Sequence, residues 1–104
     1  MKPAKPLTRQ QILQALRKHD RVLKKLSVRK IGLFGSYARE EQTHKSDIDL
    51  IVEFKRPTFD NFMALNDYLE KLFKKKVEIL TPEGVDSIRI REVAESIKKS
   101  VVYV

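Results

Sequence analysis

Apolar residues recur at the three- and four-residue spacing of an α-helix in three stretches of the chain. They predict helices from about residue 9 to 19, from 59 to 73 and from 86 to 99. Thr8 and Thr58 stand just before the first two and can cap them through a hydroxyl oxygen. The expected core-facing stripes are Ile12, Leu13 and Leu16, then Phe62, Leu65, Leu69 and Leu72, then Ile90, Val93, Ala94 and Ile97.

Short apolar runs between these helices predict β-strands. The runs cover residues 28–34, 47–54 and 77–81, and residues 101–104 are also apolar and rich in β-branched side chains. In the second run every even position is apolar, whereas the odd positions are mixed. Side chains alternate along a strand, so this run should have one core-facing side and one side that carries acids.

The remaining segments are short. Residues 22–26 either extend the first helix or form a second short turn, residues 36–41 suit one or two helical turns, residues 42–46 form a polar loop, and residues 82–84 form a turn. Helices that alternate with strands in a short chain predict the α/β (α+β) class, with a small mixed sheet of three to four strands flanked by helices. We expect residues 1–104 to form a single domain with a frayed terminus at residues 1–7.

Composition limits the partners and the setting. The chain has no cysteine, no apolar stretch long enough to span a membrane and no signal peptide, which makes the cytoplasm the default location. The formal net charge is +8. Such an excess suits nucleic acid, nucleotides or an acidic protein partner, but it also simply keeps a small domain soluble. No nucleic-acid-binding motif accompanies the charge, so nucleic-acid binding is the weaker of these hypotheses.

The pair Asp47-x-Asp49 is the first candidate for chemistry. Both carboxylates should leave the same face of the strand, with Cα atoms roughly 6.6 to 7 Å apart. Two like charges repel each other, and a hard cation such as Mg²⁺ relieves that repulsion through oxygen ligands. The pair alone is more typical of a solvated strand edge. Its position in an otherwise apolar strand favours a metal site.

Gly35-Ser36 is the second candidate, at the junction of the first strand and a short helix. Free backbone N–H groups at a helix start, together with the Ser36 hydroxyl, can hold phosphate oxygens. Glycine allows a phosphate to approach the backbone closely because it lacks a Cβ. Gly-Ser after a strand is by itself an ordinary turn. A phosphate-binding turn shortly before a carboxylate pair is a far more specific combination.

These motifs resemble a known family. Residues 35–41 (GSYAREE) followed by 46–52 (SDIDLIV) are similar to the Gly-Ser…Asp-x-Asp signature of the DNA polymerase beta-like nucleotidyltransferases. Within that superfamily the chain resembles the minimal nucleotidyltransferases from about Leu7 to Val104. The resemblance implies that Gly35 and Ser36 bind the triphosphate of an NTP, expected to be ATP. It also implies that Asp47 and Asp49 bind one or two Mg²⁺ ions.

A third carboxylate completes the site in that family, and the matching residue here is Glu78 in the third strand. As a metal ligand or as the group that takes the acceptor's proton, Glu78 would join Asp47 and Asp49 as a catalytic residue. Two positions depart from the family pattern. Glu78 stands where Asp is usual, which puts full activity in doubt, and Glu40 stands where Gly is common, so that the short helix could end differently.

The resemblance also implies a partner. Minimal nucleotidyltransferases typically act as antitoxins of HEPN-domain ribonuclease toxins, and some adenylylate a tyrosine of the toxin. We therefore expect AMP transfer from ATP to a cognate HEPN-type protein, in a homo- or hetero-oligomer. The alternative is an antitoxin with weak or no catalysis that neutralises its partner by stoichiometric contact, using the apolar residues 101–104 as part of its surface.

Several residues near the motifs have open roles. Arg39 could contact phosphate or pair with an acid, and Tyr37 is expected to pack against the sheet. His44 and Lys45 could reach the triphosphate, although lone basic loop residues are usually solvated. His19 shows no partner in the sequence, so we assign it no role.

Overall fold

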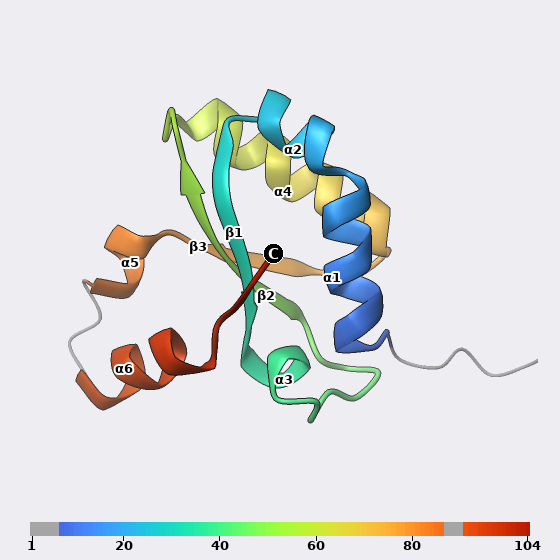
Figure 1. Ribbon diagram of the computed structural model, residues 1–104, viewed down its shortest axis with the longest axis vertical. Coiled ribbons are helices and arrows are strands. Elements are labelled where there is room, and N and C mark those ends of the chain that lie inside the picture. The colour runs from blue at the N-terminus through green and yellow to red at the C-terminus, as the bar shows by residue number, and fades with distance from the viewer. Residues whose placement is uncertain (1–6, 87–90) are drawn as a thin grey trace, which may run out of the picture.

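The computed structural model describes residues 7–86 and 91–104, which form a four-stranded sheet with helices on both faces (Figure 1). The expected fold class is confirmed. The strands are β1 (Val28–Phe34), β2 (Ile48–Phe54), β3 (Val77–Leu80) and β4 (Val102–Tyr103). The helices are α1 (Arg9–Lys18), α2 (Asp20–Lys25), α3 (Gly35–Ala38), α4 (Phe59–Phe73), α5 (Pro82–Asp86) and α6 (Arg91–Ser100).

The sheet is mixed, with strand order β3-β2-β1-β4. β1 pairs with β2 and with β4 in antiparallel fashion, whereas β2 and β3 are parallel and α4 connects them. A parallel pair requires such a crossover, because the chain must return to the end of the sheet at which the first of the two strands began. The register sets Asp49 between Phe34 of β1 and Glu78 of β3, which places candidate residues from two segments in one row.

Helix capping follows the sequence. The Thr8 hydroxyl accepts a hydrogen bond from the Gln11 N–H at 3.1 Å, and the Gln11 side chain accepts one from the Thr8 N–H at 3.0 Å. This reciprocal capping box begins α1. Thr58 begins α4 in a similar way, accepting a hydrogen bond from the Asn61 N–H at 3.1 Å. Both predicted starts are therefore confirmed, and α4 also ends at the predicted residue.

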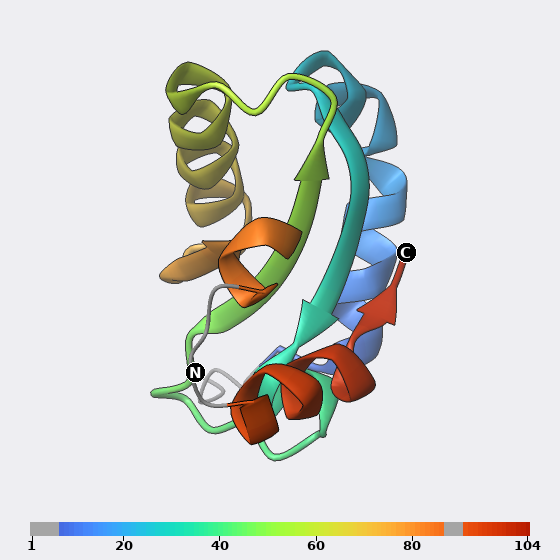
Figure 2. The same ribbon diagram turned by 90° about the vertical axis from the view of Figure 1, so that its left-hand side faces the viewer.

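The main core lies between one face of the sheet and α1, α2 and α4. From β2 it takes the even-numbered residues Ile48, Leu50 and Val52, all fully buried. On the opposite face Phe34 and Ile51 form a smaller cluster, against which Leu80, Ile97 and Val101 pack. Figure 2 views this second face, with α5 and α6 in front of the strands. The alternation in β2 thus predicts the two faces correctly.

One prediction at the C-terminal end is wrong, because residues 82–84 lie in the short helix α5 rather than in a turn. The helix expected over residues 86–99 is described from Arg91 to Ser100, and residues 87–90 lie outside the described residues. Pro82 suits the first position of a helix, and the Thr81 hydroxyl accepts a hydrogen bond from the Gly84 N–H at 3.1 Å. This capping contact favours helix over turn. Ile90, a predicted core residue, lies outside the described residues.

Smaller boundaries also differ. The helix expected over residues 36–41 ends at Ala38, the second strand begins at Ile48 and leaves Asp47 just before it, and residues 22–26 fall largely in the separate helix α2. The expected frayed terminus at residues 1–7 lies outside the described residues except for Leu7, whose carbonyl accepts a hydrogen bond from Gln42 Nε2 at 3.2 Å.

His19 does have a partner, contrary to expectation. Its Nδ1 and the Tyr68 hydroxyl are 2.6 Å apart, and the two rings meet edge to face. His19 lies between α1 and α2, and Tyr68 lies on α4, so this hydrogen bond joins the helices that cover the core face. Within the residues that the structure describes, no helix is long and apolar enough to cross a membrane.

Candidate functional site

Gly35 and Asp49 are in direct contact where β1 ends. Gly35 has φ +75°, a conformation that side-chain-bearing residues rarely adopt. A Cβ on Gly35 would collide with Oδ2 of Asp49. Glycine is therefore required for two reasons, the backbone conformation and the space that the carboxylate takes. The structure brings the expected phosphate-binding turn and the expected metal ligand against each other.

Asp49, Glu78 and Asp47 form a group of interacting carboxylates, which we call the acidic triad. Asp49 and Glu78 are register partners on adjacent parallel strands. Burial raises the pKa of Asp49 to about 6, and the negative charges of Glu78 and Asp47 and a hydrogen bond to the Glu78 side chain add to the shift. The Arg39 guanidinium acts in the opposite direction. The three acids named from the sequence are thus close enough to influence one another.

The chemistry of this triad fits a divalent cation. Oxygen ligands of like charge favour Mg²⁺ or a similar hard ion, which would replace the proton that Asp49 binds more readily because its pKa is raised. Among the described residues no group of three or more His, Cys, Asp or Glu side chains has metal-binding geometry as it stands. The carboxylates of Asp49 and Glu78, which are register partners, would have to reorient around an ion.

The exposure of the three acids differs. Asp47 and Asp49 are half-buried, and Glu78 is exposed on β3, which is an edge strand of the sheet. The site therefore opens at one side of the sheet, and a substrate can reach it from solvent. The strand assignment of Glu78 and its alternation with buried Val77 and Ile79 are as predicted.

Arg9 holds the end of α3, a role with no signal in the sequence. Its Nη1 donates to the Ala38 carbonyl at 3.2 Å, and its Nη2 lies 3.1 Å from Oε1 of Glu40. Glu40 itself has φ 59°, in the left-handed region that favours glycine. This explains why glycine suits the position in related signatures. Arg9 ties α1 to the turn that carries Gly35 and Ser36.

Ser36 lies in α3 and is half-buried, next to Tyr37, which is fully buried as predicted. The Tyr37 hydroxyl has no hydrogen-bond partner among the described residues. Arg39 has an ion pair with Glu41, with 3.4 Å between Nε and Oε2. One of the two hypotheses for Arg39, pairing with an acid, is thus confirmed, and its charge also acts on Asp49.

The loop before β2 is held by its own polar groups. The Thr43 N–H donates to the Ser46 hydroxyl at 2.9 Å, and the Ser46 N–H donates to the Thr43 carbonyl at 3.1 Å. Lys75 Nζ donates to the His44 carbonyl at 3.0 Å, which ties the loop to the segment before β3. The side chains of His44 and Lys45 are exposed, and their contact with a triphosphate stays a prediction.

Comparison with known proteins gives a consistent result. Residues 13–104 match the family described as "Nucleotidyltransferase domain". A protein of Methanocaldococcus jannaschii named "Putative protein adenylyltransferase" is 45% identical over 101 residues, covering 93% of this chain and 98% of its own length. "Protein adenylyltransferase MntA" of Thermococcus cleftensis is 35% identical over 100 residues, covering 94% of this chain and 97% of its own length.

The fold has a counterpart among solved structures. A chain described as "Structure of putative minimal nucleotidyltransferase" superposes with a TM-score of 0.73, covering 95% of this chain and 98% of its own length. The two sequences are 20% identical. At that identity the likeness concerns the arrangement of sheet and helices.

Proposed function

This chain belongs to the nucleotidyltransferase domain family, and from that premise we propose that it transfers AMP from ATP to a side chain of a partner protein. The partner we propose is a HEPN-type ribonuclease toxin, and the acceptor is a tyrosine hydroxyl, so the modification makes this chain an antitoxin. The observation that carries the transferase activity is the contact between Gly35 and Asp49, next to Glu78.

In the proposed reaction the acceptor oxygen attacks the α-phosphorus of ATP in line with the departing pyrophosphate. A new oxygen–phosphorus bond forms, and the bond between the α-phosphorus and the bridging oxygen breaks. Gly35 and the N–H groups at the start of α3 bind phosphate oxygens, with the Ser36 hydroxyl as a further donor. This binding orients the triphosphate above the acidic triad.

Asp47, Asp49 and Glu78 would hold one or two Mg²⁺ ions, which supply positive charge to the triphosphate and the leaving group. Glu78 is also suited to accept the proton that the acceptor hydroxyl loses, because it is exposed beside Asp49 at the open side of the sheet. Arg39, close enough to act on the charge of Asp49, can help to orient the carboxylates.

The proposal can be tested with labelled ATP, MgCl₂ and the HEPN-type protein encoded beside this chain. We expect intact-mass measurement of the partner to show one or more added AMP units, located on tyrosine by fragmentation. An Asp47→Asn/Asp49→Asn double variant should lose transfer by at least about a thousandfold, or about 4 kcal/mol in activation free energy. An Asp60→Asn/Asp67→Asn variant, with exposed acids of α4 replaced, serves as the matched control.

Whether the double variant still silences the partner distinguishes AMP transfer from the alternative, stoichiometric binding. If the double variant leaves the toxin unmodified and still silences it fully, stoichiometric binding rather than transfer is the antitoxin mechanism. Offering all four nucleoside triphosphates in competition tests the base preference. Mass increments other than that of AMP would contradict the choice of ATP.

A further inference from the structure

β1 has an open edge at the end far from the acidic triad. On this side its neighbour β4 pairs with Gly32 and Leu33, and the Val104 N–H donates to the Ile31 carbonyl at 3.0 Å. Within the described parts of the chain, no strand pairs with residues 28–30 on that side. An unpaired strand edge presents N–H and C=O groups that can bind an added strand.

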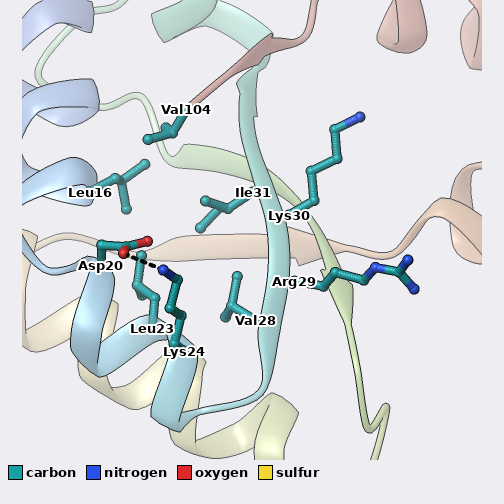
Figure 3. Close-up of a pocket in the computed structure, with 9 residues that line it drawn as sticks. All are labelled: Leu16, Asp20, Leu23, Lys24, Val28, Arg29, Lys30, Ile31 and Val104. Carbon is teal, nitrogen blue, oxygen red and sulfur yellow. Dashed lines mark ion pairs between the residues drawn. The ribbon is translucent and has the colours of Figure 1, made fainter.

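A hollow of about 100 Å³, lined by five aliphatic and four charged residues, lies beside this edge, between β1 and the helices α1 and α2 (Figure 3). The aliphatic side chains that line it are Leu16, Leu23, Val28, Ile31 and Val104. Asp20 and Lys24 lie at its rim and are paired with each other, with 3.0 Å between Nζ and Oδ2. The hollow therefore has room for an aliphatic side chain and presents no unpaired acid to it.

The other face of the same edge is basic. The register of β1 and β2 shifts between Val28 and Lys30, so the consecutive residues Arg29 and Lys30 are both exposed. Figure 3 shows both side chains leaving the strand on the side opposite the hollow. Lys30 Nζ lies 4.1 Å from the ring centroid of Tyr103, which holds this cation in place beside the edge.

We infer that this edge binds an extended segment of a partner protein in which apolar and acidic residues alternate. Side chains of an added strand point alternately to the two faces of the sheet. The apolar residues would enter the hollow, and the acidic residues would meet Arg29 and Lys30. The inference depends on charge complementarity and on the edge itself, and it does not require the transfer reaction.

Two other occupants fit less well. A second copy of this chain with net charge +8 would place Arg29 and Lys30 near their own copies, which repel. A single-stranded nucleic acid would need a series of aromatic side chains on which bases stack. None of the described residues that line this hollow is aromatic, and the Tyr103 ring beside the edge is already in contact with Lys30. A separate hollow, lined by Lys24, Lys25, Lys55 and Arg56 among others, is the more basic one.

The test uses the ¹⁵N-labelled full chain and a capped peptide of alternating Val and Glu residues. A peptide of the same composition with all Val residues before all Glu residues is the control. At about 150 mM salt, where the Debye length is about 8 Å, we expect saturable shifts of the amide signals of residues 28–31 and Val104. The alternating peptide should bind at least about tenfold more tightly than the control.

Charge-reversal variants sharpen the test. Arg29→Glu/Lys30→Glu should weaken binding of the alternating peptide by at least about tenfold, whereas Lys55→Glu/Arg56→Glu, an equal reversal at the other hollow, should change it by less than about threefold. If the first variant does not fold, a peptide of alternating Val and Lys replaces it as the measurement, and this peptide should not bind the unmodified chain.

Four outcomes would overturn the inference. Two concern affinity: equal affinity for the alternating and control peptides, and equal loss of affinity in the two charge-reversal variants. The third is displacement of the peptide by oligouridine with shifts centred on Lys25, Lys55 and Arg56, and the fourth is dimerisation through β1 without peptide.

β1 extends roughly 20 Å from this edge to the acidic triad, at about 3.4 Å per residue. ATP and the peptide are therefore expected to bind together.

Discussion

The two faces of the sheet differ in the residues that β2 contributes to them, apolar on one face and partly acidic on the other. On the core face, Ile48, Leu50 and Val52 of β2 are fully buried against α1, α2 and α4. On the other face, Asp49 lies between those residues in sequence, half-buried and in register with Glu78. One face stabilises the fold by removing apolar surface from water. The other keeps like charges together, at a cost in free energy that the core face offsets.

This comparison explains why the triad can exist in so short a chain. Repelling carboxylates placed on a flexible loop would move apart, whereas a strand fixed by its buried neighbours cannot adjust. Gly35 adds to this constraint, because the Asp49 carboxylate occupies the space that a side chain at position 35 would need. Asp49 is therefore held in place both by the buried neighbours in β2 and by the space beside Gly35, as the proposed cation site requires.

The largest expected effect on stability comes from the core face. Leu50→Ala should lower the free energy of unfolding by about 3 kcal/mol, because it leaves a cavity in a fully buried position. Glu53→Ala, on the other face of the same strand, should change it by less than about 0.5 kcal/mol. Chemical denaturation measures both. Equal losses would show that the two faces do not divide their roles as we describe.

Gly35→Ala should lower both the stability of the fold and the transfer activity. We expect a loss of about 2 kcal/mol in unfolding free energy, because the new Cβ meets Asp49 and φ is positive, together with a loss of measurable transfer. Gly84→Ala in α5 is the matched control and should retain transfer. Its Cβ would lie 3.3 Å from the Thr81 hydroxyl oxygen, which is a tight but tolerable contact. An active Gly35→Ala variant would contradict the site geometry.

The repulsion and burial of charge in the acidic triad should appear in the pH dependence of the free energy of unfolding. The pKa of Asp49 is raised to about 6, so the neutral form stabilises the fold at low pH and that contribution is lost as the pH rises. Asp49→Asn should match the unmodified chain below about pH 4 and be more stable above about pH 6. The shift is worth about 1 kcal/mol once the partial exposure of Asp49 is discounted.

Thermal unfolding in metal-free buffer at several pH values measures this difference. Adding MgCl₂ at pH 8 should raise the melting temperature of the unmodified chain and have little effect on Asp49→Asn. As the pH falls below about 6, protons should compete with Mg²⁺ and weaken its binding. A variant that is less stable than the unmodified chain at pH 8 would contradict the repulsion among the acids.

The smallest expected effect concerns Glu40, in the turn that follows α3. Glu40→Gly should raise the unfolding free energy by about 0.5 kcal/mol, because glycine relieves the left-handed backbone and only an exposed ion pair with Arg9 is lost. Glu41→Gly, one residue further and without positive φ, should not be stabilising. Differential scanning calorimetry can compare the two. Destabilisation by Glu40→Gly would mean that the Arg9 contact outweighs the backbone strain.

Much of the fold follows from local patterns. Alternation in β2, the helical stripes of α1 and α4 and the two threonine caps each depend on residues near in sequence, and all are confirmed. The errors have two causes. His19 pairs with Tyr68, on a helix far along the chain, which no local pattern shows. In α5 the contact is local, because Pro82 and Gly84 suit a turn as well as a helix and the Thr81 hydroxyl caps the helix.

For the site, residue types and spacing make Gly35, Ser36, Asp47 and Asp49 candidates, and the resemblance to the minimal nucleotidyltransferases adds Glu78. Their roles stay predictions. The sequence also determines that acids and core residues share one strand. Only the tertiary structure decides that Gly35 touches Asp49, that Glu78 joins it in register and that Arg9 holds the turn. These contacts join segments that are distant in the chain, and strand pairing and side-chain packing, which no local pattern encodes, bring them together.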